Sequence, residues 1–125
     1  MEASSAAAGS SEIAERLASG LELIATGRYF EAHEELELAW RAAPAEERDF
    51  FQGLVHVAVA WYQAGRGNRP GCERQLIKAA RRLDAYGPAH RGVDLAGVLA
   101  QVAVAAETVR GGSLELVPVT LGDER

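Results

Sequence analysis

The sequence predicts an all-α fold, a single bundle of about five helices connected by short loops. Apolar residues recur every three or four positions in several stretches, which is the period of a helix with one buried face. No strands alternate with helices, and 125 residues suit one domain. We therefore expect a flexible, disordered N-terminus over residues 1–10, a helical bundle domain over residues 11–112 and an extended C-terminal tail over residues 113–125.

The first two predicted helices are bounded by glycine and proline. The first opens at Ser11, ends near Gly27 and carries apolar residues at helical spacing: Ile13, Leu17, Leu21 and Ile24. Its other face is polar, and we expect that face to be exposed. The second covers residues 29–43, because a residue that precedes a proline, here Pro44, avoids helical geometry.

Turn residues also separate the next two helices. Pro44 and the glutamates that follow it are typical of a helix start, so we expect the third helix to continue to about Ala64. A glycine-rich loop over residues 65–71 precedes the fourth helix, which covers about residues 71–86 and ends before Pro88.

The end of the chain is predicted to be a helix followed by an arm. A short irregular segment holds His90, and the fifth helix covers residues 93–110, ended by two glycines. The tail contains four apolar residues that could pack on the bundle or against a second subunit: Leu114, Leu116, Val117 and Val119.

Charge divides the sequence into two opposite halves. Residues 31–49 hold seven acidic and two basic residues, whereas residues 66–91 hold seven basic and two acidic residues. We expect an acidic and a basic surface, which face each other in one molecule, meet between subunits or bind separate partners. The net charge of -5 argues against general nucleic-acid binding, which depends on cationic contacts to phosphates.

Composition predicts a bacterial protein of the cytoplasm. The single cysteine excludes an intramolecular disulfide, and no leader-like segment opens the sequence, so a reducing compartment is expected. The longest uncharged apolar run, residues 50–64, is shorter than the ~20 residues of a membrane span, so we expect no membrane partner. Twelve arginines against one lysine are typical of a GC-rich bacterial genome.

Three sequence blocks occur in a family-like order: residues 27–40 (GRYFEAHEELELAW), residues 50–54 (FFQGL) and residues 66–68 (RGN). This combination resembles the domain of unknown function 309 family of small bacterial and archaeal proteins, over roughly Leu21 to Leu99. The resemblance implies an all-helical bundle and no established activity. His56 departs from the family pattern, in which a glutamine or an apolar residue is expected.

The second predicted helix contains a histidine among glutamates. His33 and Glu37 lie one turn apart near Trp40, which is a spacing that could hold a metal. The zinc-protease motif needs a second histidine where Glu37 stands, and the di-iron motif needs a glutamate where Phe30 stands. A mixed site with a group of the third helix stays open, and the alternative is a hydrogen-bonded His33 that orients Trp40.

The third predicted helix carries a polar stripe on an otherwise apolar surface: Asp49, Gln52, His56 and Gln63. Buried polar groups need partners, so this stripe forms either one side of a pocket or a structural hydrogen-bond network. The residues of the candidate pocket are His33, Glu34, Glu37, Trp40, Gln52 and His56.

The fourth predicted helix and the loop before it form a candidate basic surface: Arg66, Arg69, Arg74, Lys78, Arg81 and Arg82. This surface could bind an acidic partner or a phosphate-bearing ligand, or it could be a solvated face with an acidic neighbour in the same molecule. Cys72 lies on the apolar side of this helix, where we expect it to be inert.

These features predict a non-enzymatic interaction or scaffold module that binds an unknown protein partner or a second copy of itself. Two alternatives stay open, a metal-dependent hydrolase and a protein that binds a small polar ligand. Both would use the seam formed by His33, Glu37, Gln52 and His56, with Glu34 as a further candidate in the hydrolase. For the leading function we predict no cofactor and no metal.

Overall fold

Five α-helices in two layers make up the computed structural model, which describes the backbone of residues 2–122 and the side chains of residues 11–122. The helices are α1 (Glu2–Ala25), α2 (Tyr29–Ala42), α3 (Arg48–Gly65), α4 (Arg69–Leu83) and α5 (Leu95–Arg110). The 3-10 turns Ala45–Glu47 and Asp84–Tyr86 precede α3 and follow α4. The prediction of an all-α bundle with about five helices is therefore confirmed.

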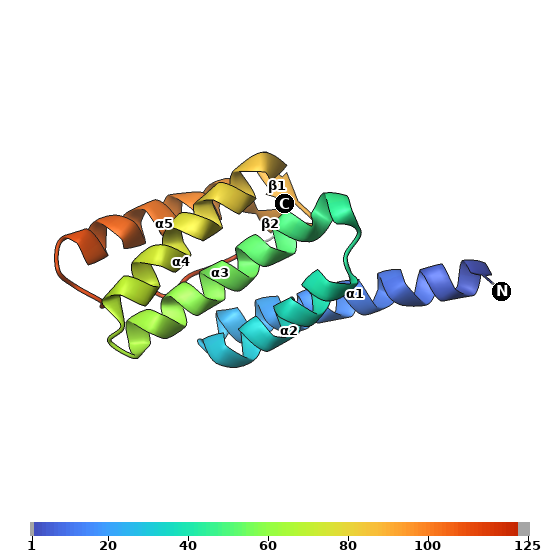
Figure 1. Ribbon diagram of the computed structural model, residues 1–125, viewed down its shortest axis with the longest axis horizontal. Helices are drawn as coiled ribbons and strands as arrows, with labels where there is room; N and C mark the ends of the chain where they lie inside the picture. Colours follow the sequence, from blue (N-terminus) through green and yellow to red (C-terminus); the bar gives the residue numbers. More distant parts are fainter. Residues whose placement is uncertain (1, 123–125) are drawn as a thin grey trace.

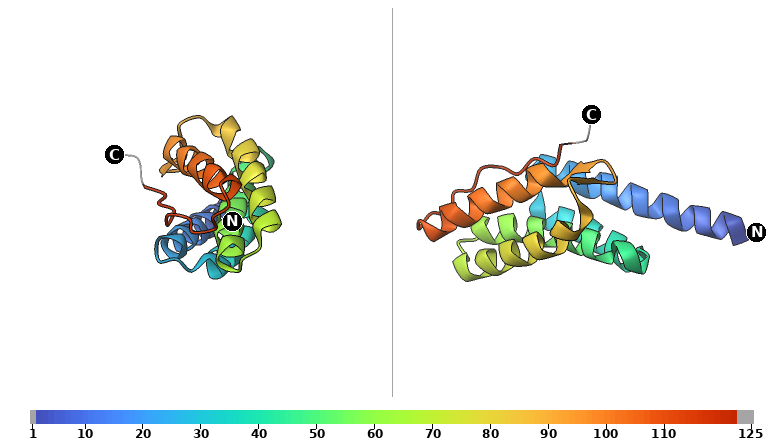
Figure 2. Two further views of the ribbon diagram at one scale, coloured as in Figure 1. Left: turned by 90° about the vertical axis from the view of Figure 1, so that its left-hand side faces the viewer. Right: turned by 90° about the horizontal axis from the view of Figure 1, so that it is seen from above.

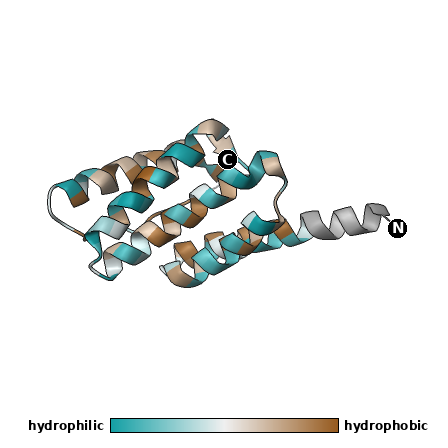
Figure 3. Cartoon of the chain, in the orientation of Figure 1, coloured by the Kyte–Doolittle hydropathy of each residue, from teal (hydrophilic) through white to brown (hydrophobic). Residues whose placement is uncertain are grey.

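The central helix of the front layer is α3, which packs against α2 on one side and α4 on the other. Figure 2 shows that α1, α5 and the C-terminal tail form the layer behind these three helices. Phe50, Phe51, Leu54 and Val57 of α3 are completely buried between the layers. Figure 3 shows hydrophobic residues along the length of α3, as expected for a helix with neighbours on most sides.

The first helix begins earlier than the sequence predicts. Its backbone is helical from Glu2 rather than from Ser11, and its N-terminal end extends beyond the other helices (Figure 1). Alanine has the highest helix propensity of all residues, and residues 3–8 contain four alanines, which favours this extension. The predicted disorder of residues 1–10 stays a prediction, because Met1 and the side chains of residues 2–10 lie outside the described part.

Side-chain caps set the starts of α4 and α5. The side chain of Asn68 accepts a hydrogen bond from the backbone N–H of Gly71, and the side chain of Asp94 accepts one from Gly97, both at 3.0 Å. Such caps satisfy backbone donors that the first turn of a helix leaves unpaired. The predicted helix boundaries at residues 71 and 93 are therefore correct to within two residues.

The segment around His90 is a small hairpin rather than irregular chain. Strands β1 (Ala89–His90) and β2 (Val93–Asp94) pair in antiparallel register, and the turn between them places Arg91 and Gly92 at positive φ. Two residues at positive φ are the geometry of a tight hairpin turn. The hairpin fixes the direction in which the side chains of His90 and Arg91 leave the backbone.

The C-terminal tail packs on the bundle, which was one of the two predicted alternatives. Residues 113–122 are extended and lie between α1 and α5 (Figure 2), and Val119 is 2% exposed. The indole N–H of Trp61 donates a 2.9 Å hydrogen bond to the carbonyl of Val117, and the Gln101 side chain pairs with the backbone of Thr120. Residues 123–125 lie outside the described part.

Candidate functional site

A polar hollow lies between α3 and α4, two helices that approach each other closely at Gly53. A Cβ atom on Gly53 would lie 2.6 Å from the Leu83 side chain, so only glycine allows this approach. The hollow has a volume of about 450 Å³. Its lining combines part of the α3 polar stripe with three cations of α4: Asp49, Gln52, His56, Lys78, Arg81 and Arg82.

His56 is the most buried member of this hollow, with 9% of its surface exposed. Its Nδ1 lies 2.7 Å from Oε1 of Gln75 on α4, and in this orientation of the amide Nδ1 donates the hydrogen bond. The other ring nitrogen, Nε2, is buried and has no partner within the described residues. Leaving a buried polar group without a hydrogen bond costs about 1–3 kcal/mol of folding stability, so a polar contact to Nε2 would be favourable.

Burial lowers the pKa of His56, and the positive charges of Arg82 and Lys78 add to this effect. The hydrogen bond with Gln75 acts in the opposite direction but is the smaller influence. His56 is therefore a neutral imidazole near pH 7, with Nδ1 bound to Gln75 and Nε2 without a partner among the described side chains.

His33 lies at a different hollow, of about 230 Å³, between α2 and the C-terminal end of α3. The lining of that hollow is Phe30, His33, Val59, Tyr62 and Gln63. His33 Nδ1 lies 3.3 Å from the carbonyl of Phe30, and Nε2 lies 3.3 Å from a carboxylate oxygen of Glu37. The ring is thus held by its own helix, and the role of His33 in orienting Trp40 stays a prediction.

The six residues of the candidate pocket are therefore not brought together in one hollow. Gln52 and His56 share the α3–α4 hollow, whereas His33 and Glu37 form a pair on α2, where Glu34 is exposed. The guanidinium of Arg48 lies over Trp40, with its Cζ atom 5.1 Å from the centroid of the Trp40 ring. The separation arises because α3 turns its stripe toward α4 at its N-terminal end and toward α2 at its C-terminal end.

A metal site with His33 and Glu37 would need a third ligand. Among the side chains of residues 11–122, no group of three His, Cys, Asp or Glu is arranged to hold a metal ion. The nearest candidate from the sequence, His56, faces α4 and binds Gln75 instead. The predicted mixed site is therefore not formed by the described residues.

Two residues of the candidate basic surface find acidic partners on neighbouring side chains. Arg82 donates to Asp49 at 2.6 Å across the two helices, and Arg69 lies 3.7 Å from Glu73. Arg66 instead donates to the Tyr62 hydroxyl at 3.1 Å. Within residues 11–122, three cations of α4 form no ion pair: Arg74, Lys78 and Arg81.

The acidic surface expected on α2 is largely neutralised by arginines. Three of its four glutamates form ion pairs: Glu31 with Arg28, Glu35 with Arg16 and Glu37 with Arg41. Of the two predicted charged surfaces, the basic one on the exposed face of α4 therefore keeps more charges without an ion pair in the described residues.

An apolar groove of about 330 Å³ follows the other side of α4, where it meets α5. Small residues on both helices leave this groove open, and Ile77 on its edge is 55% exposed. The apolar part of the lining includes Leu76, Ile77, Ala80, Leu99, Val102 and Ala106, and the charged Glu73 and Arg110 also line the groove. The sequence does not predict this groove, although the position of Ile77 beside Arg74 and Arg81 follows from helical spacing.

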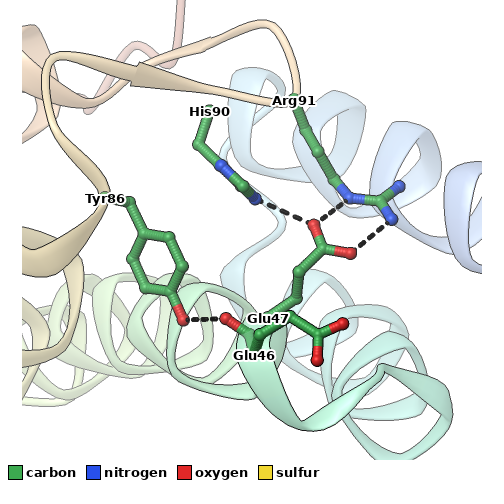
Figure 4. A network of polar contacts seen from close by, with 5 residues as sticks. All are labelled: Glu46, Glu47, Tyr86, His90 and Arg91. Carbon is green, nitrogen blue, oxygen red and sulfur yellow. Dashed lines mark hydrogen bonds and ion pairs between the residues drawn. The ribbon is translucent and has the colours of Figure 1, made fainter.

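Figure 4 shows a further polar cluster, which joins the turn before α3 to the hairpin. The sequence does not predict this cluster. The Glu47 carboxylate accepts two hydrogen bonds from Arg91, at 2.6 and 2.7 Å, and lies 2.8 Å from His90 Nε2. The Tyr86 hydroxyl donates to the carbonyl of Glu46 at 2.9 Å. The hydrogen bonds from Arg91 are the main reason that the pKa of Glu47 is lowered to about 2.

Cys72 has no features of a reactive thiol. It is completely buried, and burial is the larger of two causes that raise the pKa of its thiol, the other being the charge of Glu73. A thiol with a raised pKa stays protonated near pH 7 and is a poor nucleophile. The described helices also include none that is long and apolar enough to cross a membrane.

Comparison with known proteins supports the resemblance noted in the sequence. The uncharacterized protein YpuF of Bacillus subtilis (strain 168) is 37% identical over 79 residues, which make up 62% of this chain and 44% of that relative. The model of the family described as domain of unknown function (DUF309) matches residues 17–75, so the match ends before Leu99. These residues form the C-terminal part of α1, all of α2 and α3, and the first half of α4. Residues 17–75 are therefore similar to the family of domain of unknown function DUF309.

Proposed function

We propose that this protein is a non-enzymatic interaction module, which binds an amphipathic helix of a partner protein in the groove between α4 and α5. The partner helix has an apolar face, which lies in the groove, and an acidic edge, which lies along α4. The observation that carries this proposal is an open apolar groove next to cations that have no acidic partner in the described chain.

The groove itself accounts for the apolar half of this recognition. Ile77 leaves more than half of its surface in water, while Ala80 and Ala106 are too small to fill the space beside it. Burying an isoleucine side chain completely contributes about 1.5–3 kcal/mol, so an apolar partner residue at this position gains affinity. Helix-in-groove recognition uses such anchors at the i, i+3, i+4 and i+7 positions of the bound helix.

The charge pattern accounts for the acidic edge. Arg74 precedes Ile77 by three residues, so this cation lies beside Ile77 on the exposed face of α4. A solvated basic face balanced by an acidic neighbour was the alternative, and it describes Arg82 and Arg69, which pair with Asp49 and Glu73. Arg74, in contrast, forms no ion pair within residues 11–122. Carboxylates of a partner would orient the bound helix and speed its association.

We place this interaction in the bacterial cytoplasm. The buried, protonated thiol of Cys72 suits a reducing compartment, and the relative described above comes from a bacterium.

A synthetic helical peptide with leucines on one face and glutamates along the flank tests the proposal. We expect the Ile77→Ser variant to bind this peptide about tenfold more weakly than the wild type, by isothermal titration calorimetry, since an apolar anchor contact is lost. Val104→Ser is the matched control, because Val104 is equally exposed on α5 but lines another hollow.

The same titration separates the charge contribution from the apolar one. A peptide with glutamine in place of glutamate should bind the wild type more weakly, and Arg74→Gln should remove that difference. Equal effects of Ile77→Ser and Val104→Ser would contradict the groove as the binding site. A dimer in sedimentation experiments that Ile77→Ser dissociates would show that a second copy occupies the groove, which also contradicts the proposal.

A further inference from the structure

The polar hollow between α3 and α4 lies on the opposite side of α4 from the apolar groove and shares no lining residue with it. We infer that this hollow binds the phosphate group of a small phosphate monoester, held by Lys78, Arg81 and Arg82, with His56 as its innermost polar contact. This site is independent of the helix-binding groove proposed above.

The charge of the hollow fits such a group. Lys78, Arg81 and Arg82 face a single carboxylate, that of Asp49, so the hollow carries two net positive charges. A phosphate monoester carries about -1.5 to -2 charges near pH 7, which matches that excess. A simple carboxylate ligand would neutralise only half of it.

The donors of the hollow are also suited to phosphate. Asp49 accepts one hydrogen bond from Arg82, and a guanidinium has five N–H donors in total, so Arg82 keeps donors for a ligand. Arg81 forms no ion pair within residues 11–122, and its planar fork can bind two phosphate oxygens at once. The Gln52 amide adds a neutral donor on the α3 side.

His56 supplies the second, independent observation. It is nine-tenths buried, lines the hollow, and has a ring nitrogen without any partner in the described chain. With Nδ1 as the donor to Gln75, Nε2 is an acceptor, and the O–H of a singly protonated phosphate can donate to it. With the Gln75 amide reversed, Nε2 carries the proton and donates to a phosphate oxygen. Phosphate is thus able to satisfy Nε2 in either arrangement.

The exposed positions of Lys78 and Arg81 give a ligand access to the hollow. Nε2 of His56 exposes less than 1 Å², so a ligand reaches it only when a neighbouring side chain shifts. Lys78 and Arg81 are long, exposed and free of ion pairs within residues 11–122, so they can shift without breaking an internal salt bridge. The nuclear magnetic resonance signal of Nε2 therefore shows whether the ligand enters the hollow or stays on its surface.

Nuclear magnetic resonance titrations of the full chain test this inference, with inorganic phosphate, glycerol 3-phosphate and acetate at equal ionic strength. We expect both phosphates to shift the Nε2 nitrogen signal of His56, and glycerol 3-phosphate to bind at least as tightly as inorganic phosphate. We expect acetate to leave this signal in place. Tighter binding of inorganic phosphate would assign the site to the free anion and overturn the monoester assignment.

Single substitutions on α4 then locate the binding site. Lys78→Gln and Arg81→Gln should each weaken phosphate binding about tenfold, because each removes a charge-assisted contact. Arg74→Gln is the matched control, since it removes a neighbouring charge of the same helix that does not line the hollow, and it should change the affinity less than twofold. Equal losses in all three variants would show non-specific attraction to a basic helix and overturn the inference.

The two proposals fail independently in these experiments. Ile77→Ser should lose the acidic peptide and keep the phosphate, because Ile77 lies on the groove side of α4. His56→Phe should keep the peptide, and it should lose the phosphate if His56 is a contact of the ligand. A His56→Phe variant that binds phosphate as the wild type does would overturn the role of His56.

Discussion

At the scale of single residues, the carboxylate of Glu47 makes three short polar contacts, all with the two hairpin residues His90 and Arg91. It connects the 3-10 turn that precedes α3 to the hairpin through Arg91 and His90 (Figure 4). Its side chain is only 16% exposed, so these contacts are partly shielded from water. A shielded, bidentate pair with arginine is stronger than the exposed pairs of α2.

We predict that Glu47 makes stability dependent on pH below about 4.5. The pKa of Glu47 is about 2 in the folded protein, against 4.5 as its ordinary value, so the folded state favours the charged form. The resulting stability is fully present above pH 4.5 and is lost as the pH falls toward 2. Thermal unfolding followed by circular dichroism between pH 2 and pH 7 measures this loss.

The Glu47→Gln variant should be less stable at pH 7 and should lose less stability on acidification than the wild type. Glu46→Gln is the control, because Glu46 is exposed and takes part in the cluster only through its backbone carbonyl. A Glu47→Gln variant with the acid transition of the wild type would contradict the role given to this carboxylate.

The cluster also shows which part of the structure single-residue patterns cannot predict. Glu47 and Arg91 are 44 positions apart in sequence, and their meeting depends on how α3, α4 and the hairpin pack. His33 is the opposite case, since its partners are three and four residues away on the same helix. Local spacing therefore predicts the surroundings of His33, whereas those of Glu47 and His56 depend on the tertiary fold.

At the scale of elements, helix periodicity and turn residues predict the helices well. Pro44 and the glycines before Asn68 and after Arg110 lie where helices end or begin. Spacing along α3 also predicts its polar stripe, but not which neighbour each residue of that stripe faces. Because α3 packs between two helices, Gln52 and His56 meet α4 while the C-terminal end of α3 meets His33. The sequence therefore predicts the polar residues but not their division into two hollows.

The contact between α3 and α4 depends on Gly53, which gives a second prediction about stability. In Gly53→Ala the new Cβ would lie 2.6 Å from the fully buried Leu83, so either the Leu83 side chain or the helices must shift. We expect a loss of about 1–3 kcal/mol in the free energy of unfolding, measured with urea. The hydrogen-exchange rate of the His56 ring N–H, measured by nuclear magnetic resonance, should also change if the contact between Gln75 and His56 is disturbed.

Gly65→Ala is the matched control for this substitution. Gly65 is also in α3, but a Cβ atom there would meet nothing within 4 Å. Since alanine favours helices more than glycine does, Gly65→Ala should leave stability unchanged or raise it. Equal destabilisation by both substitutions would contradict a specific role for the α3–α4 approach.

At the scale of the whole molecule, the C-terminal tail completes the back layer of the bundle. It occupies the space between α1 and α5, where it covers Trp61 of the front layer (Figure 2). The family match ends at residue 75, so the tail, the hairpin and α5 lie outside the matched segment. The described fold nevertheless uses all of them, because Val93, Val98, Val109 and Val119 belong to one core with the matched helices.

This arrangement predicts that the tail contributes to global stability through its buried residue rather than through its length. Val119 is 2% exposed, whereas Val117, two positions earlier, is 75% exposed and contacts Trp61 through its backbone carbonyl. Val119→Ala should lower the free energy of unfolding by about 1–3 kcal/mol, because it leaves a cavity in the core. Val117→Ala keeps the carbonyl that accepts the Trp61 hydrogen bond, so it should change stability by less than about 0.5 kcal/mol. Trp61 fluorescence in a Trp40→Phe background follows both variants during urea unfolding. If the tail were only loosely attached, the two substitutions would have the same small effect, and the Trp61 signal would change before the bundle unfolds.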